Sequence, residues 1–443
     1  MRKDIVVTSI WSLVLTACIG LQAFAVAGLI ASAALVLMFL YSIVMSRGAL
    51  TVLPFVIGLS PFYVLLRDQL LSYSVYTWFL ILIIANIFIF SRSNFSRVFS
   101  HKLTFLFTLL FSSFIFYGVI IGSDLIKFMK FVEMTVGMLL VVLCMQEDKL
   151  RDRCFEILGV STLLVWLAML PGLETRFVMK ASEGVLNTDP SSMAAFIVVV
   201  LVWNLYKVQN KSLTNVSGTV SLSVISSFLV LLLLSTSRTN LSISLVLVTI
   251  FSLFRFSSSV KLVGVMLPIL FVVSIVIQSS TIDTLSNYYI DKIFASDRTL
   301  NQITSHRYDQ WVLVLAYIAN TDFLTLLLGL GPGKGAVVAH LFSMYGSFTE
   351  MSSLQMYLEL HSLYLTIFVE GGLIFLVAFL VLLFELIKVR LLGVRRGAEM
   401  QLLFAIAWAM TLFANSGLGM SGALMLGCAL SVGMSLDRSR LRV

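Results

Sequence analysis

The sequence predicts an all-α membrane protein, a bundle of transmembrane helices with one long extramembrane loop. The first observation is composition: the 443 residues are 59% hydrophobic and only 12% charged, with mean hydropathy +1.02. Soluble domains carry about 25% charged residues, so the bilayer must solvate most of this surface. The second is that the apolar runs are close to a bilayer thickness in length and do not alternate, which predicts helices.

The apolar runs number about fourteen and are separated by short polar segments. Their approximate bounds are 5–23, 26–45, 50–66, 73–91, 103–121, 125–146, 155–172, 190–206, 218–236, 240–254, 262–279, 362–387, 400–415 and 420–436. A count of twelve requires two of them to be re-entrant or interfacial. The chain thus divides into a bundle of about eleven spans (1–279), a long loop (280–361) and about three C-terminal spans (362–443).

The third observation is the placement of charge. Lys and Arg outnumber Asp and Glu by 30 to 22, but they gather in alternate short loops, as topology signals do. This pattern excludes a nucleic-acid partner and predicts both termini in the cytoplasm, with the long loop on the opposite side. The first run follows Arg2 and Lys3 without a cleavage site, so we expect a retained span. None of the four cysteines lies in a predicted outer loop, so neither a disulfide framework nor a metal site is expected.

The loop 280–361 is too long to be an idle connection, and loops of this length are usually functional. Its stretch 307–329 is apolar but carries charged and amide residues. We expect a helix lying in the membrane interface, with Trp311 and Tyr317 as anchors; a short additional span is the alternative. A turn-rich segment, GLGPGKG (329–335), and a second helical stretch near 350–361 follow.

Two arginines on the predicted outer face are candidates for binding an anion. Arg238 lies in STSRTNLS (235–242), where two apolar runs meet, and Arg307 begins the expected interfacial helix. A guanidinium grips phosphate in a bidentate fashion, and a helix N-terminus also favours anions. The alternatives are a snorkelling Arg238 and an Arg307 that only solvates the helix end.

A third candidate site is LHSLYLTIFVEGG (360–372). His361 stands at the mouth of a span and could act as a general base; a histidine satisfied by headgroups or a carbonyl is the alternative. Glu370 follows about 13 Å deeper at helical rise. A carboxylate inside a span needs a partner, so Glu370 either shapes the site or binds a loop across the bundle.

Lys334 and Arg176 are weaker candidates for glycan binding or support. Lys334 lies in GLGPGKG, which lacks the GKS or GKT of a phosphate-binding loop and is favoured as a tight turn. Arg176 lies in the outer segment 173–189, which either lines a sugar-binding cleft or, as is favoured, forms a solvated loop. Together, several cations and one base are what glycosyl transfer from a lipid pyrophosphate requires.

The order of these motifs resembles the O-antigen ligase and O-antigen polymerase superfamily. The resemblance covers roughly 170–375: a Ser-Arg turn between two late spans, an Arg before a Trp in a long outer loop, a G-x-G-x-G turn, and HSLYL…EGG opening a span. It departs in having His361-Ser362 where His-Asn is frequent, and Gly372 and Phe375 fit the ligase pattern only in part.

The resemblance implies a GT-C-like helical enzyme of the bacterial inner membrane. Its donor would be a glycan on undecaprenyl pyrophosphate at the periplasmic face, with no metal or cofactor. By similarity, Arg238 and Arg307 would engage the pyrophosphate and His361 would be the base, while Arg176 resembles the basic sugar-chain loop of the polymerases only vaguely. The implied partners are the lipid-linked glycan, the bilayer and a polysaccharide chain-length regulator.

We therefore expect a polysaccharide polymerase that transfers the growing chain to a new lipid-linked repeat unit. A ligase with lipid A–core as acceptor is the near alternative, since fourteen spans suit polymerases better than ligases. A non-enzymatic transporter or flippase of the lipid-linked glycan is the distant alternative. Transporters tend to show paired halves and broken helices at the midplane, and no such symmetry is visible in this sequence.

Overall fold

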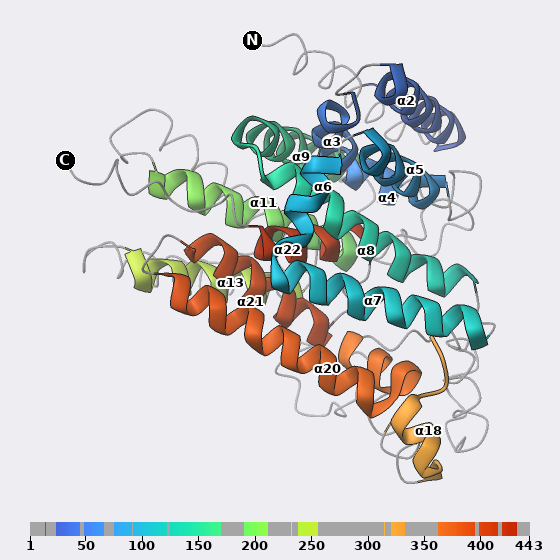
Figure 1. Cartoon of the computed structure of the whole chain (residues 1–443). Helices are drawn as coiled ribbons and strands as arrows, with labels where there is room; N and C mark the ends of the chain where they lie inside the picture. The colour runs from blue at the N-terminus through green and yellow to red at the C-terminus, as the bar shows by residue number, and fades with distance from the viewer. Residues whose placement is uncertain are drawn as a thin grey trace, which may run out of the picture.

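The computed structural model describes 24–44, 48–65, 75–90, 92–121, 125–169, 190–210, 238–255, 320–332, 362–394, 398–414 and 419–431, together with residues 14, 232 and 314. Every regular element in these ranges is a helix, which confirms the all-α prediction (Figure 1). The helices are α2 (Phe24–Val44), α3 (Gly48–Gly58), α4 (Ser60–Leu65), α5 (Val75–Phe90), α6 (Arg92–Phe99), α7 (Lys102–Ile121), α8 (Leu125–Met145), α9 (Asp148–Met169), α11 (Pro190–Asn210), α13 (Arg238–Arg255), α18 (Phe323–Leu328), α20 (Leu363–Gly393), α21 (Glu399–Ala414) and α22 (Met420–Leu430).

Three helices are long and apolar enough to cross a membrane: Val26–Val44 within α2, Lys102–Ile121 and Leu363–Gly393. Shorter apolar helices occur in α5, α11, α13, α21 and α22. The chain is therefore a helical protein suited to a membrane. The runs 5–23, 218–236 and 262–279 fall almost wholly outside the described residues, as do both termini and most of the loop 280–361. The span count, the sidedness of the termini and the domain division stay predictions.

Small residues let the central helices approach closely. Helix α22 contacts α8, α21 and α11 and lies in the middle of the bundle (Figure 1). A Cβ atom placed on Gly137 of α8 would lie 2.9 Å from the Cβ of Ala423, and one on Gly427 of α22 would lie 2.6 Å from the Val141 side chain. Lipid tails are as apolar as the helix side chains, so the hydrophobic effect does not drive helices together in a membrane. Association depends on van der Waals packing, which the close approach at glycines allows.

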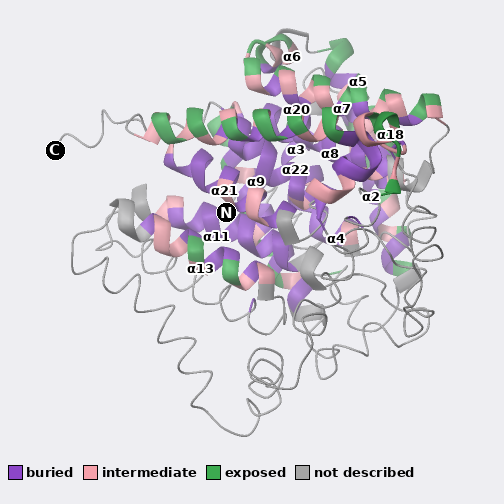
Figure 2. Cartoon of the chain, turned by 90° about the horizontal axis from the view of Figure 1, so that it is seen from below, coloured by how far each residue is buried: buried purple, intermediate pink, exposed green. Residues whose placement is uncertain are grey.

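One side of the bundle exposes large apolar side chains. Helix α20 buries Phe379 and Leu386 but exposes Val377 and Phe384, the latter at 65%. Figure 2 shows exposed residues along α7 and α20, whereas α22 is almost wholly buried. Water-soluble monomers rarely carry apolar patches of this extent, so these faces fit contact with lipid chains.

The helices differ from the predicted runs at several described places. The run 50–66 is two helices, α3 and α4, separated at Leu59, and α6 forms within a predicted loop. The apolar stretch 307–329 is not one helix, because the backbone bends at Thr321 and is extended at Asp322. Within this span-long run only the short helix α18 and isolated helical positions are described. Helix α20 continues beyond its predicted end and is interrupted at Gly372.

Candidate functional site

The structure describes two of the six predicted site residues. Arg238 is the first residue of α13, although its side chain is outside the description. Glu370 lies in α20 and is buried, with 7% of its surface exposed. The other four lie outside the described residues: Arg176, Arg307, Lys334 and His361. The site can therefore be built from α20 and from the piece of the long loop that contacts it.

Helix α20 begins where the sequence predicts. Ser362 is its N-cap residue, with extended backbone (φ −146°, ψ 124°). The carbonyl oxygen of Ser362 accepts hydrogen bonds from the Thr366 amide (3.0 Å) and the Thr366 hydroxyl (2.9 Å). The first turn is thus closed directly after position 361, in agreement with the predicted start of a span at 362.

A break at Gly372 divides α20 into two parts. Gly372 has φ 71° and ψ −174°, so the carbonyls at the end of the part 363–371 cannot all be bonded within the helix. Two loop amides supply partners. The Leu330 amide donates to the Val369 carbonyl (2.9 Å), and the Gly331 amide donates to the Glu370 carbonyl (2.8 Å).

Glycines make this contact between backbones sterically feasible. Gly329 (φ 75°), Gly331 (φ 99°) and Gly372 adopt a conformation that other residues rarely adopt. A Cβ atom on Gly329 would collide with the backbone of Glu370, and one on Gly372 would collide with the carbonyl of Leu327. We call residues 329–331 together with residues 369–372 the glycine joint. Both segments were recognised as motifs from the sequence, but a contact between them was not predicted.

The helix α18 leads directly into the glycine joint. The Asp322 carboxylate caps it, accepting hydrogen bonds from the Thr325 amide (3.0 Å) and the Thr325 hydroxyl (2.6 Å). The hydroxyl bond is the main reason that the pKa of Asp322 lies below its usual value. Phe323 and Leu324 of α18 are exposed, and α18 lies beside the ends of α7 and α20 (Figure 1). This arrangement suits an interfacial position.

Helix α7 also contacts the glycine joint. The Tyr117 hydroxyl lies 3.5 Å from the Gly329 carbonyl oxygen, and a Cβ atom on Gly331 would meet the Ile121 side chain at 3.0 Å. Tyr117 also stacks on Phe375 of α20, with ring centroids 6.0 Å apart. Phe114, nearly one turn earlier on α7, contacts the same ring at 5.2 Å. The joint therefore rests on two helices.

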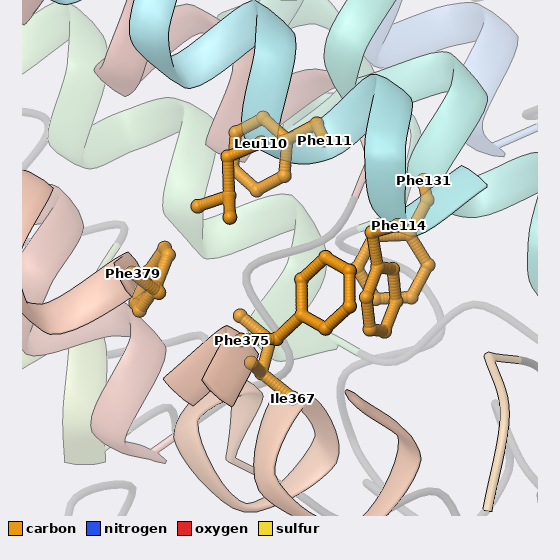
Figure 3. A pocket seen from close by; sticks show the side chains of 7 residues that line it. All are labelled: Leu110, Phe111, Phe114, Phe131, Ile367, Phe375 and Phe379. Atoms are coloured by element: carbon orange, nitrogen blue, oxygen red, sulfur yellow. The ribbon is translucent and has the colours of Figure 1, made fainter. Parts of the chain in front are cut away.

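An apolar pocket lies beside the joint, between α7, α8 and α20. Figure 3 shows the seven lining side chains, all of which are apolar: Leu110, Phe111, Phe114, Phe131, Ile367, Phe375 and Phe379. Ile367 precedes the break in α20 and Phe375 follows it. A lining without polar groups supplies no acid, base or nucleophile.

A second buried carboxyl group, Glu133 of α8, lies elsewhere in the bundle. The Thr77 hydroxyl of α5 lies 3.3 Å from a Glu133 carboxyl oxygen. The other oxygen faces Gly419 at the N-terminus of α22, where a Cβ atom would be 3.4 Å away. A helix N-terminus stabilises a carboxylate, so the contacts of Glu133 with Thr77 and α22 give it a structural role.

Metal binding is not indicated among the described residues, where no group of three His, Cys, Asp or Glu side chains could hold an ion. That the protein uses neither metal nor cofactor stays a prediction. No protein-family model matches the sequence, and comparison with curated proteins finds no significant relative. The resemblance to the O-antigen polymerase and ligase superfamily therefore depends on the motifs alone.

Proposed function

We propose that this protein is a polysaccharide polymerase of the O-antigen polymerase type. It would be a GT-C-like bundle of about fourteen spans in a bacterial inner membrane, with cytoplasmic termini and a periplasmic active site. It would transfer a growing glycan from undecaprenyl pyrophosphate to the terminal sugar of a new lipid-linked repeat unit.

The observation that carries the proposal is the glycine joint. Two of the motif segments on which the resemblance depends, GLG (329–331) and EGG (370–372), are joined by backbone hydrogen bonds. Segments this far apart in sequence have no local reason to meet. A long outer loop anchored on the span that follows His361 is what a site built from both segments requires. Arg238 at the start of α13 gives the third motif a helix N-terminus, which favours anions.

The proposed reaction needs one base and a cationic site. His361 takes the proton of the acceptor hydroxyl, and the hydroxyl oxygen forms the new bond to the anomeric carbon of the donor glycan. The bond from that carbon to the pyrophosphate oxygen breaks, and undecaprenyl pyrophosphate leaves with the electron pair. Arg238 and Arg307 stabilise the negative charge on the leaving group. Arg176, Lys334 and Glu370 are the supporting candidates for holding glycan or shaping the cleft.

The test is a gel of surface glycolipid from a strain lacking this protein, complemented with wild type, Arg307→Ala or His361→Ala. A polymerase predicts core capped with a single repeat unit in the null strain, restored to a ladder only by wild type. Immunoblots of membranes must show equal amounts of each variant. Normal chain length with inserted Arg307→Ala would remove the assignment of Arg307.

The same gel separates the alternatives. Bare core, with long chains remaining on the lipid carrier, would indicate a ligase, which performs the same chemistry on lipid A–core. The break in α20 favours the transporter alternative, because discontinuous helices are typical of transporter binding sites. A transporter predicts lipid-linked repeat units trapped on the cytoplasmic leaflet, and an unchanged ladder would remove all three lipopolysaccharide functions.

A further inference from the structure

We infer that Gly329, Gly331 and Gly372 are positioning residues that hold the outer loop in register on α20. The inference rests on the proposed function, because it assigns these glycines a role in aligning donor and base. None of the three has a side chain to contact a substrate. Their contribution is the fixed relation between the segment that follows α18 and the broken span.

The joint is more constrained than a turn requires. A type II turn needs one residue at positive φ and a type I turn needs none. Here Gly329 and Gly372 are both at positive φ and face each other, each occupying space that a side chain on the other would need. The adjacent hydrogen bonds to Val369 and Glu370 fix the loop along the helix axis as well. Sliding the loop along α20 would break both bonds and bring Cβ-bearing residues into the contact.

Both segments of the joint are close in sequence to residues of the proposed site. Its loop side is three residues from Lys334, and its helix side belongs to the span that begins directly after His361. A transfer that needs a donor and a base in alignment is sensitive to displacements of about 1 Å, which can cost about 100-fold in rate. Loosening the joint should therefore lower kcat, whereas KM, set by contacts to the donor, changes little.

The experiment compares Gly372→Ala and Gly329→Ala with the control Gly159→Ala. Gly159 lies in α9, where a new Cβ would be 3.7 Å from Val200, an ordinary contact. Each protein is reconstituted in proteoliposomes and assayed on lipid-linked glycans extracted from the null strain. Hydrogen–deuterium exchange of peptides covering 326–332 reports the joint directly, and peptides from α8 and α22 report the fold of the bundle.

The expected result is faster exchange at 326–332, unchanged exchange in α8 and α22, and a fall in kcat of about tenfold or more at similar KM. Gly159→Ala should match wild type in all three. If Gly372→Ala does not insert, Gly331→Ala takes its place, because its Cβ would meet the flexible Ile121 side chain and not backbone.

An opened joint with undiminished kcat would overturn the positioning role, and so would a kcat loss without faster exchange at 326–332. A wild-type protein that transfers no glycan, yet shows slow exchange at 326–332, would overturn the proposed function and the positioning role with it. The two failures are therefore distinguishable in one set of samples.

Discussion

The amide nitrogen of Gly331 lies 2.8 Å from the carbonyl oxygen of Glu370, so the long loop and helix α20 share a backbone hydrogen bond. In a bilayer each unbonded backbone group costs several kcal/mol, so a helix can break only where something else satisfies its carbonyls. Here the loop does so. The break at Gly372 and the docking of residues 329–331 are thus one structural feature, because the loop amides bond carbonyls that the break leaves without helical partners.

The cap of α18 predicts a pH dependence outside the bundle. Because the pKa of Asp322 is lowered in the folded state, its stabilising effect is fully present above the ordinary carboxyl pKa. It is lost as pH falls through the lowered folded value. We expect hydrogen exchange at Thr325, compared at matched intrinsic rates, to lose protection below about pH 4.

Two variants isolate this effect. Asp322→Asn keeps a good N-cap acceptor without a titrating group, so protection at Thr325 should be independent of pH. Asp322→Ala should remove protection at every pH. Protection of the wild-type amide that is unchanged down to pH 2.5, a value about a unit or more below the ordinary carboxyl pKa, would contradict the role of the carboxylate.

The close contact between α8 and α22 predicts that adding a single methyl group at Gly427 destabilises the protein. A Cβ atom on Gly427 would lie 2.6 Å from the Val141 side chain and 3.0 Å from the Met138 carbonyl, so one of the helices must move. We expect Gly427→Ala to destabilise the protein by about 1–3 kcal/mol, the usual cost of overpacking. Thermal unfolding in detergent measures it, with Gly159→Ala as the tolerated control.

Hydropathy predicted the bundle better than it predicted the site. The bounds of α2, α7 and α8 lie within about two residues of the predicted runs, because a long apolar run in lipid has few alternatives to helix. The interruption at Asp322 was visible as a charge in an apolar stretch, but periodicity did not show that helix α18 would begin there. The contact between Gly329 and Gly372 depends on packing of distant segments, which no local pattern encodes. Four of the six predicted site residues lie outside the described ranges, and their roles stay predictions.

The buried carboxyl group of Glu133 gives a further stability prediction. Thr77→Val is nearly isosteric but removes a donor 3.3 Å from the carboxyl. Loss of a hydrogen bond to such a group costs about 1–3 kcal/mol. The matched control is Thr135→Val in α8, whose hydroxyl donates to the Phe131 carbonyl in its own helix. Equal thermal unfolding temperatures for the two variants would mean that the Thr77 contact contributes nothing specific.

The exposed apolar face of α20 predicts where lipid begins. Val377 and Phe384 are exposed on the same helix that buries Phe379 and Leu386, so their surroundings must be hydrocarbon if the bundle sits in a bilayer. Oxygen partitions into hydrocarbon, whereas a charged nickel chelate stays in water. Nitroxide labels on Val377→Cys and Phe384→Cys in proteoliposomes should therefore relax with oxygen and hardly with the chelate. A label on Ser100→Cys, just after the short polar helix α6, should show the reverse.

The three native cysteines described, Cys144, Cys154 and Cys428, are buried, so a background labelling experiment on wild type establishes how far they react. Strong chelate relaxation at Val377 would place this face in water and would require a protein partner, not lipid, to cover it.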